Sequence, residues 1–255
     1  MLRRSLAIKE QLGDQAGAAR TLNELGRLDQ ARGNYRAASA RYRRNLELLR
    51  ELGDRSGEAS SLYNLGAVAF ELGDYEEAKT AYNESLAIFE GLGDRHNAAS
   101  CRQALGRVSH ERGDFLAARA TYMQNLEVFQ KLAAQSSVAE VCHDLGRLAR
   151  DEGDYLHASE RFQESLAVGR KLGDLGAMLA TLHELGRLAI DRGDLDGALA
   201  PIDESLELAR RLGARSGIAR GRLELGRLYS RQGDAAACLT AAAAAWTRAE
   251  NSASG

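Results

Sequence analysis

The chain of 255 residues has little of several residue types that mark particular protein classes. It contains one proline, three cysteines and 5% aromatic residues, and its 34 lysine and arginine residues are balanced by 36 aspartate and glutamate residues. No stretch approaches the ~18 uncharged apolar residues of a membrane span. The balanced charge provides no basic field for nucleic acid, and three cysteines without a C-x-x-C motif favour a reduced compartment over a disulfide framework. We therefore expect a cytoplasmic protein that binds neither membranes nor nucleic acid.

Two further classes are excluded by what the sequence does contain. Hydrophobic residues make up 44% of the chain, which is too many for a disordered protein. The N-terminal segment has no long apolar core and no small-residue cleavage site, so it is not a signal peptide. The unusual feature is 26 glycines beside a single proline, since a loop-rich domain would contain several prolines.

The glycines are periodic. A Leu-Gly pair recurs every 40 residues, at Leu25-Gly26, Leu65-Gly66, Leu105-Gly106, Leu145-Gly146, Leu185-Gly186 and Leu225-Gly226. A second glycine follows seven residues after each pair and precedes Asn or Asp, and a third recurs from Gly13 onward, with Ala133 in its place once. A 40-residue period kept through six copies predicts a stacked array of repeats.

Each repeat reads as two helices. In the second copy, apolar residues are spaced by three and four positions from Ala59 to Leu72 and again from Tyr75 to Leu86. Gly73-Asp74 between them predicts a left-handed helix end followed by an N-cap, which gives a hairpin of two helices of about 15 residues each. The glycine of each Leu-Gly pair lies in mid-helix, where it costs up to ~1 kcal/mol relative to alanine. Its recurrence predicts a close approach by a neighbouring helix.

These motifs resemble the tetratricopeptide repeat over nearly the whole chain. In the first copy, Leu25-Gly26, the turn Gly33-Asn34-Tyr35, Ala38 and Tyr42 match the family's pattern. The 40-residue length and the Leu-Gly-Asp linker are similar to a longer subclass found in animal spindle-orientation adaptors and in sensor domains of bacterial MalT-like and related NTPase regulators. The resemblance implies an all-α fold, a right-handed superhelical solenoid of antiparallel helical hairpins.

The expected organisation is one solenoid over residues 1–250. It begins with a partial helix over 1–13 and continues with six repeats, at 14–53, 54–93, 94–133, 134–173, 174–213 and 214–250, before a disordered tail at 251–255. Because the helix that would precede residues 1–13 is absent, we expect Leu2, Leu6 and Ile8 to face a missing neighbour. This edge indicates a fragment of a longer array, a mis-set start, or a module that self-associates.

No motif for catalysis, a metal or a cofactor is present: the sequence lacks a P-loop, a G-x-S-x-G elbow and an H-E-x-x-H pair. The expectation is a non-enzyme without cofactor or metal, whose thiols are buried and inert.

Candidate binding residues come from positions that the repeat does not need for folding. In the tetratricopeptide resemblance the first helix of each hairpin lines a concave groove. The register after Leu-Gly is arginine in five of six copies, an Arg ladder with neighbours about 10 Å apart, and in most copies an acid or amide stands three residues earlier, within helical reach. The predicted groove residues are Arg27, Tyr63, Asn64, Phe70, Gln103, Arg107, His110, His143, Arg147, Arg150, His183, Arg187 and Arg227.

Two interpretations of the Arg ladder remain open. The arginines and their acids could solubilise the groove and link adjacent helices, each pair contributing ~0.2–1 kcal/mol. Alternatively, Arg107, whose preceding acid is replaced by Ala104, and its neighbours bind carboxylates of an acidic peptide or partner segment. The functional hypothesis is a peptide-binding regulatory or sensor scaffold. The alternatives are an enzyme or small-molecule sensor that uses the Glu, His and Arg residues of the groove, and a self-assembling structural module.

Overall fold

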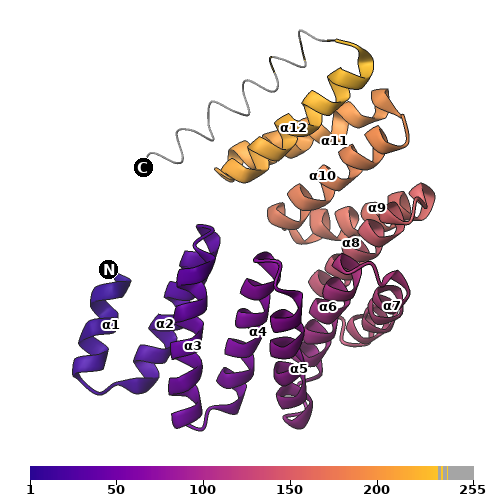
Figure 1. The fold of residues 1–255 in the computed structure, drawn as a ribbon. Helices are drawn as coiled ribbons and strands as arrows, with labels where there is room; N and C mark the ends of the chain where they lie inside the picture. The colour runs from indigo at the N-terminus through magenta and orange to yellow at the C-terminus, as the bar shows by residue number, and fades with distance from the viewer. Residues whose placement is uncertain (235–236, 238–239, 241–255) are drawn as a thin grey trace. The chain divides into compact units, whose positions relative to one another are not determined.

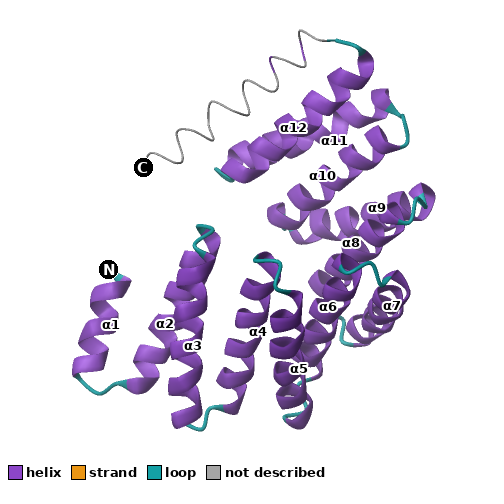
Figure 2. Cartoon of the chain, in the orientation of Figure 1, coloured by secondary structure: helices purple, strands orange, loops and turns teal. Residues whose placement is uncertain are grey.

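The computed structural model describes residues 1–234 together with 237 and 240, and in this part of the chain it consists of helices without strands (Figures 1 and 2). The predicted tail at 251–255 and the end of the last repeat lie outside the described residues. The chain divides into two compact units, residues 1–128 and residues from 129 onward. The helices are α1 (Leu2–Gln11), α2 (Gln15–Ala31), α3 (Tyr35–Glu51), α4 (Arg55–Glu71), α5 (Tyr75–Gly91), α6 (Arg95–Glu111), α7 (Phe115–Lys131), α8 (Gln135–Asp151), α9 (Tyr155–Leu172), α10 (Leu175–Asp191), α11 (Leu195–Arg211) and α12 (Arg215–Gln232).

The helices pair as the 40-residue period predicts. Helices α2 and α3, α4 and α5, α8 and α9, and α10 and α11 pack as hairpins, and each hairpin also contacts the next one within its unit. Most helices have 17 residues rather than the predicted 15, because only two or three residues separate one helix from the next. The all-helical fold of repeated hairpins is therefore confirmed.

The short connections depend on glycine and aspartate. The turn glycines adopt φ angles between +63° and +83°, a left-handed conformation that residues with a Cβ disfavour. At the start of α4, the side chain of Asp54 accepts a hydrogen bond from the backbone N–H of Gly57 at 2.9 Å, which satisfies one of the orphan donors of the first turn. Ala133 replaces the turn glycine once and still has a positive φ of 53°.

Among the described residues, five of the six Leu-Gly glycines provide room for a large side chain of the partner helix. A Cβ on Gly66 of α4 would lie 2.8 Å from two ring carbons of Tyr82 on α5, and a Cβ on Gly146 of α8 would lie 2.6 Å from the ring of Phe162 on α9. Both rings are buried. The predicted close approach is confirmed at these copies, where the approaching group is an aromatic ring. Ile202 takes this place at Gly186, and a Cβ on Gly226 would meet no described atom within 4 Å.

The N-terminal helix differs from the expectation for its edge. Leu6 of α1 is buried against Ala18, Leu22 and Leu25 of α2, and Leu2 packs on the same cluster. The prediction that Leu2 and Leu6 face a missing neighbour is therefore wrong, because both side chains turn towards α2. Ile8 remains 47% exposed.

Candidate functional site

The predicted groove residues lie on the first helices of the hairpins, on α2, α4 and α6 in the first unit and on α8, α10 and α12 in the second. Their exposure differs widely. Arg27 and Arg227 are exposed. The half-buried residues are Tyr63, Asn64, Phe70, Arg107, His143, Arg147 and Arg187. Gln103, His110, Arg150 and His183 are buried. The structure thus separates accessible candidates from residues enclosed by their neighbours.

The aromatic and histidine candidates pack within their own hairpins. The Phe70 ring lies 5.6 Å from that of Tyr75, and the His110 ring lies 5.7 Å from that of Phe115, centroid to centroid. Tyr63 lies 5.4 Å from Tyr82 in the same way. These distances are those of stabilising ring pairs, so the three side chains contribute to the packing of their hairpins.

In the first unit, polar contacts join adjacent first helices. The Nδ2 group of Asn64 on α4 donates a hydrogen bond to Oδ1 of Asn23 on α2 at 3.1 Å. Burial raises the pKa of the Tyr82 phenol and the neighbouring Tyr63 raises it further, whereas the positive charge of Arg107 on α6 opposes this rise. The positive charge of Arg107 therefore lies beside the face that Tyr63 and Tyr82 form.

In the second unit, a buried arginine connects two first helices. Arg150 of α8 has a side chain that is 5% exposed, and it forms ion pairs with Asp151 at 2.8 Å and with Glu184 of α10. On the next helix, Arg231 of α12 donates to the carbonyl of Ile190 on α10 at 3.1 Å. Helices α8, α10 and α12 are thus linked through polar contacts as well as by packing.

The predicted pairing of each arginine with the residue three positions earlier holds at one copy and fails at another. Arg227 Nη1 lies 3.0 Å from Glu224 Oε1, as predicted. Glu184, in contrast, pairs with Arg150 of the preceding repeat instead of Arg187, a choice made by the contact between α8 and α10. The carboxylate found near Arg187 is that of Asp191, with 3.9 Å between Nε and Oδ2. Within the described part of the chain the Nε group of Arg187 has no hydrogen-bond partner.

Burial shifts the pKa of two titratable groups on this face. Burial, and then the nearby Arg220 charge, lower the pKa of His183 to about 4, so its imidazole is neutral at pH 7. Burial also raises the pKa of Glu224, against the opposing effect of the Arg227 and Arg187 charges. Both shifts reflect removal of water from the face between α10 and α12.

The described residues include no group of three His, Cys, Asp or Glu side chains placed to hold a metal ion. Cys101 and Cys142 are buried, and burial followed by the neighbouring Glu164 carboxylate raises the pKa of Cys142 to about 12. The expectation of buried thiols is confirmed at these two positions, and Cys238 lies outside the described residues. Among the described helices, none is long and apolar enough to cross a membrane.

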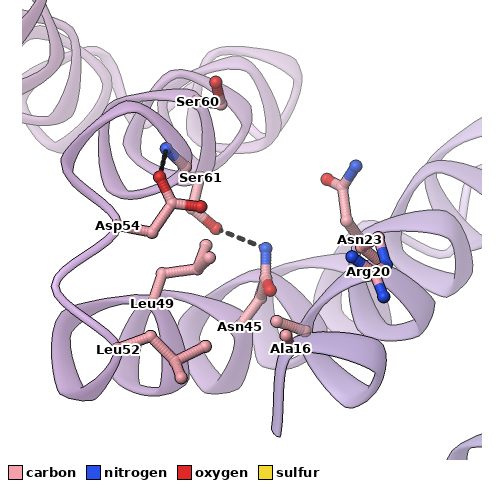
Figure 3. Close-up of a pocket in the computed structure, with 11 residues that line it drawn as sticks. Ala16, Arg20, Asn23, Asn45, Leu49, Leu52, Asp54, Ser60 and Ser61 are labelled. Carbon is pink, nitrogen blue, oxygen red and sulfur yellow. Dashed lines mark hydrogen bonds between the residues drawn. The ribbon is translucent and has the colours of Figure 1, made fainter.

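Sequence reasoning missed a cavity of about 340 Å³ in the first unit, between α2, α3 and α4 (Figure 3). It is lined by Ala16, Ala19, Arg20, Asn23, Asn45, Leu49, Leu52, Asp54, Gly57, Ser60 and Ser61. One sequence signal was available. Asn45 begins a 40-residue register of buried polar side chains on the second helices, continued by Ser85, Asn125, Ser165 and Ser205. Such a register in an apolar interface indicates hydrogen-bonding needs between repeats.

The repeated hairpins place the chain among the α-helical repeat proteins. Family models of the tetratricopeptide repeat match residues 57–131 and 178–212. The chain therefore contains tetratricopeptide repeats in these segments. No curated protein matches its sequence.

Several solved structures share the fold. BtubC from P. vanneervenii has 18% sequence identity and a TM-score of 0.70, with 85% of this chain and 91% of that chain covered. A Rap protein in complex with the Competence and Sporulation Factor has 16% identity and a TM-score of 0.79, with 88% of this chain covering 62% of that one. NprR in complex with its cognate peptide NprX has 18% identity and a TM-score of 0.74, with coverages of 95% and 72%. At these identities the likeness concerns the fold.

Proposed function

We propose that this chain is a non-enzymatic regulatory scaffold that binds an acidic peptide, or an acidic segment of a partner protein, along the first helices of its hairpins. Two observations support a peptide as the ligand. The fold is shared with proteins whose structures contain bound peptides, among them NprR with NprX. A stack of helical hairpins also offers an extended surface rather than a closed active site.

The acidic character of the partner rests on the arginines. In the second unit, Arg147, Arg187 and Arg227 occupy the same register on α8, α10 and α12, and α10 contacts both of the other helices. All three side chains reach the surface at least in part. A guanidinium group binds a carboxylate through parallel N–H donors, which is the strongest polar contact available to an acidic peptide.

Arg187 carries the argument. Its side chain is 43% exposed, its Nε group lacks a hydrogen-bond partner within the described residues, and the nearby Asp191 Oδ2 is 3.9 Å away. A donor without a partner is costly when it is removed from water. The exposed part of the Arg187 guanidinium is placed to donate to a peptide carboxylate, because Glu184 pairs with Arg150 and the Asp191 carboxylate approaches Arg187 only to 3.9 Å.

The test compares two charge-matched triple variants. The groove variant replaces Arg147, Arg187 and Arg227 with Ala. A fluorescent peptide of alternating glutamate and apolar residues is titrated into each protein at low and at physiological salt. We expect the groove variant to bind at least tenfold more weakly than the native chain, since loss of ~1.4 kcal/mol is a tenfold change in affinity. Salt should weaken the native binding, because exposed charges are screened.

The control replaces Arg43, Arg170 and Arg210, exposed arginines on second helices, with Ala. It changes the net charge equally and should bind the peptide as the native chain does. Equal affinity of the groove variant and the native chain, with helical circular dichroism retained, would refute the proposed role of the arginines.

A further inference from the structure

The cavity between α2, α3 and α4 has a polar floor that is deeply buried. Asn45 of α3 is 4% exposed and lines the cavity. Its Nδ2 group donates to Ser61 Oγ on α4 at 3.0 Å, whereas its Oδ1 atom has no hydrogen-bond partner in the described part of the chain. A buried acceptor left without a donor costs about 1–3 kcal/mol, so a ligand that donates a hydrogen bond to this oxygen would remove that cost.

The orientation of the Asn45 amide follows from its neighbours. Ser61 Oγ donates its single proton to the carbonyl of Tyr42, at 3.3 Å, so it must accept from Asn45. The amide nitrogen therefore faces Ser61 and the amide oxygen faces the other way. Figure 3 shows the amide of Asn45 between Ser61 and Ala16.

Donors stand on the opposite side of the cavity. Arg20 of α2 is exposed, forms no ion pair with the described residues, and carries five N–H donors. Asn23 lies beside it, and its Oδ1 is already occupied by Asn64. Figure 3 shows Arg20 and Asn23 together on α2, across the cavity from Asn45. The cavity thus offers an acceptor on its floor and donors on its wall.

This arrangement selects among polar groups. A carboxylate would pair with Arg20, but it would also meet the unpartnered oxygen of Asn45 and the Asp54 carboxylate, and both would repel it. An ammonium group would face Arg20. A primary amide has an NH₂ group for Asn45 and a carbonyl for Arg20, so it satisfies both sides. The volume of about 340 Å³ is at the small end of ligand pockets and suits one side chain.

The next repeat carries larger side chains at two of the positions that line this cavity. In the next repeat Tyr63 stands where Asn23 stands and Phe89 where Leu49 stands, forty residues on. Phe89 is 3% exposed and packs with Ala59 and Tyr63, so larger side chains fill the corresponding space. The smaller Asn23 and Leu49 leave room between α2, α3 and α4 at positions where the next repeat has Tyr63 and Phe89.

We propose that this cavity is a specificity pocket for the side-chain amide of a glutamine or asparagine in the bound peptide. This inference rests on the proposed peptide-binding function for its biological context. The wall of the pocket adjoins the predicted groove, because Asn23 accepts a hydrogen bond from Asn64, a predicted groove residue of α4.

The direct test needs no peptide. N-acetyl-glutamine-N-methylamide is titrated into the full chain in the millimolar range, and backbone amide signals are followed by NMR. We expect saturable shifts at Arg20, Asn23 and Ser61. The capped glutamate, leucine and glycine analogues should produce shifts at least fivefold smaller at equal concentration. Equal shifts with all four probes, or no saturable shift with glutamine, would overturn the proposal.

Two variants that introduce residues from the next repeat test whether glutamine binds in this cavity. Asn23→Tyr combined with Leu49→Phe copies the filled space and should abolish the glutamine shifts. Asn45→Ser copies Ser85, removes the unpartnered oxygen with little change in volume, and should weaken binding at least fivefold even if the double variant fails to fold. Ser100→Ala, at the equivalent of the lining residue Ser60, is the matched control and should bind normally. Undiminished glutamine shifts in Asn45→Ser would contradict the proposed acceptor.

A second arm separates this inference from the proposed function. A Glu-rich peptide with glutamine, leucine or glutamate at its central position is titrated into the native chain, and the glutamine version should bind about tenfold more tightly. If no peptide binds but capped glutamine still occupies the pocket, the peptide-binding proposal fails and the amide pocket stands. If all three peptides bind equally, the pocket has no role in specificity.

Discussion

Replacing Gly66 with Ala tests whether the Leu-Gly motif exists to admit an aromatic ring. The new Cβ would lie 2.8 Å from the Cδ1 and Cε1 atoms of Tyr82 and 3.1 Å from its Cγ atom. Carbon atoms in contact normally stay about 3.5–4.0 Å apart. Tyr82 is 4% exposed, so its ring cannot swing into solvent. Helix α4 or the ring must therefore shift.

The magnitude follows from two opposing effects. Overpacking a well-packed core costs about 1–3 kcal/mol, whereas Gly to Ala inside a helix gains up to ~1 kcal/mol. We expect Gly66→Ala to lower the free energy of unfolding by up to about 2 kcal/mol. Gly91, the last residue of α5, is exposed, and a Cβ there would meet no atom within 4 Å. Gly91→Ala is the control in the same repeat and should stabilise the chain.

The measurement is urea-induced unfolding followed by circular dichroism at equal protein concentration. The two variants should differ by about 1–3 kcal/mol, the overpacking cost alone. Repeating Gly66→Ala in a Tyr82→Leu background should reduce its cost, because the ring carbons that clash are gone. A Gly66→Ala variant as stable as Gly91→Ala, or an equal cost in both backgrounds, would refute the explanation.

Three further predictions use the same unfolding measurement. Ala133→Gly should stabilise the chain by about 1 kcal/mol, because an alanine at φ 53° is strained. Gly93→Ala, at φ 71°, should destabilise it by a similar amount. Effects of the opposite sign would show that the left-handed turn conformation does not require glycine. Lowering the pH from 7 to 5 should reduce the free energy of unfolding of the native chain by about 2 kcal/mol more than that of the His183→Gln variant. The folded pKa of His183, about 4, lies below the unfolded value, so the unfolded state takes up the proton first. Parallel pH profiles of the two proteins would count against this. Arg150→Ala should destabilise the chain by about 3–5 kcal/mol, because it leaves the carboxylate of a largely buried ion pair without its partner. Arg43→Ala breaks an exposed ion pair and should change stability by less than about 1 kcal/mol. Similar effects of the two substitutions would disprove the distinction.

The fold followed from the sequence because its determinants are local and repeated. Gly73-Asp74 ends one helix and caps the next within four residues, and each apolar face is spaced at helical intervals. Helix lengths were predicted two residues short, since the periodicity of apolar residues does not mark the first and last turns. The site was less accessible to prediction. The Arg ladder is visible in the sequence, but the exposure of each arginine and the pairing of Glu184 with Arg150 depend on how neighbouring hairpins pack.

The sequence by itself determined the repeat length, the hairpins, the positions of the turns and the identity of the glycine that must stay small, because each of these depends on residues within one 40-residue period. The tertiary structure alone decided which polar groups are buried together. Asn45 and Ser61 come from successive repeats, and so do Arg150 and Glu184. Helical periodicity places a side chain on a face of its own helix, but the register between two packed hairpins decides what it meets there.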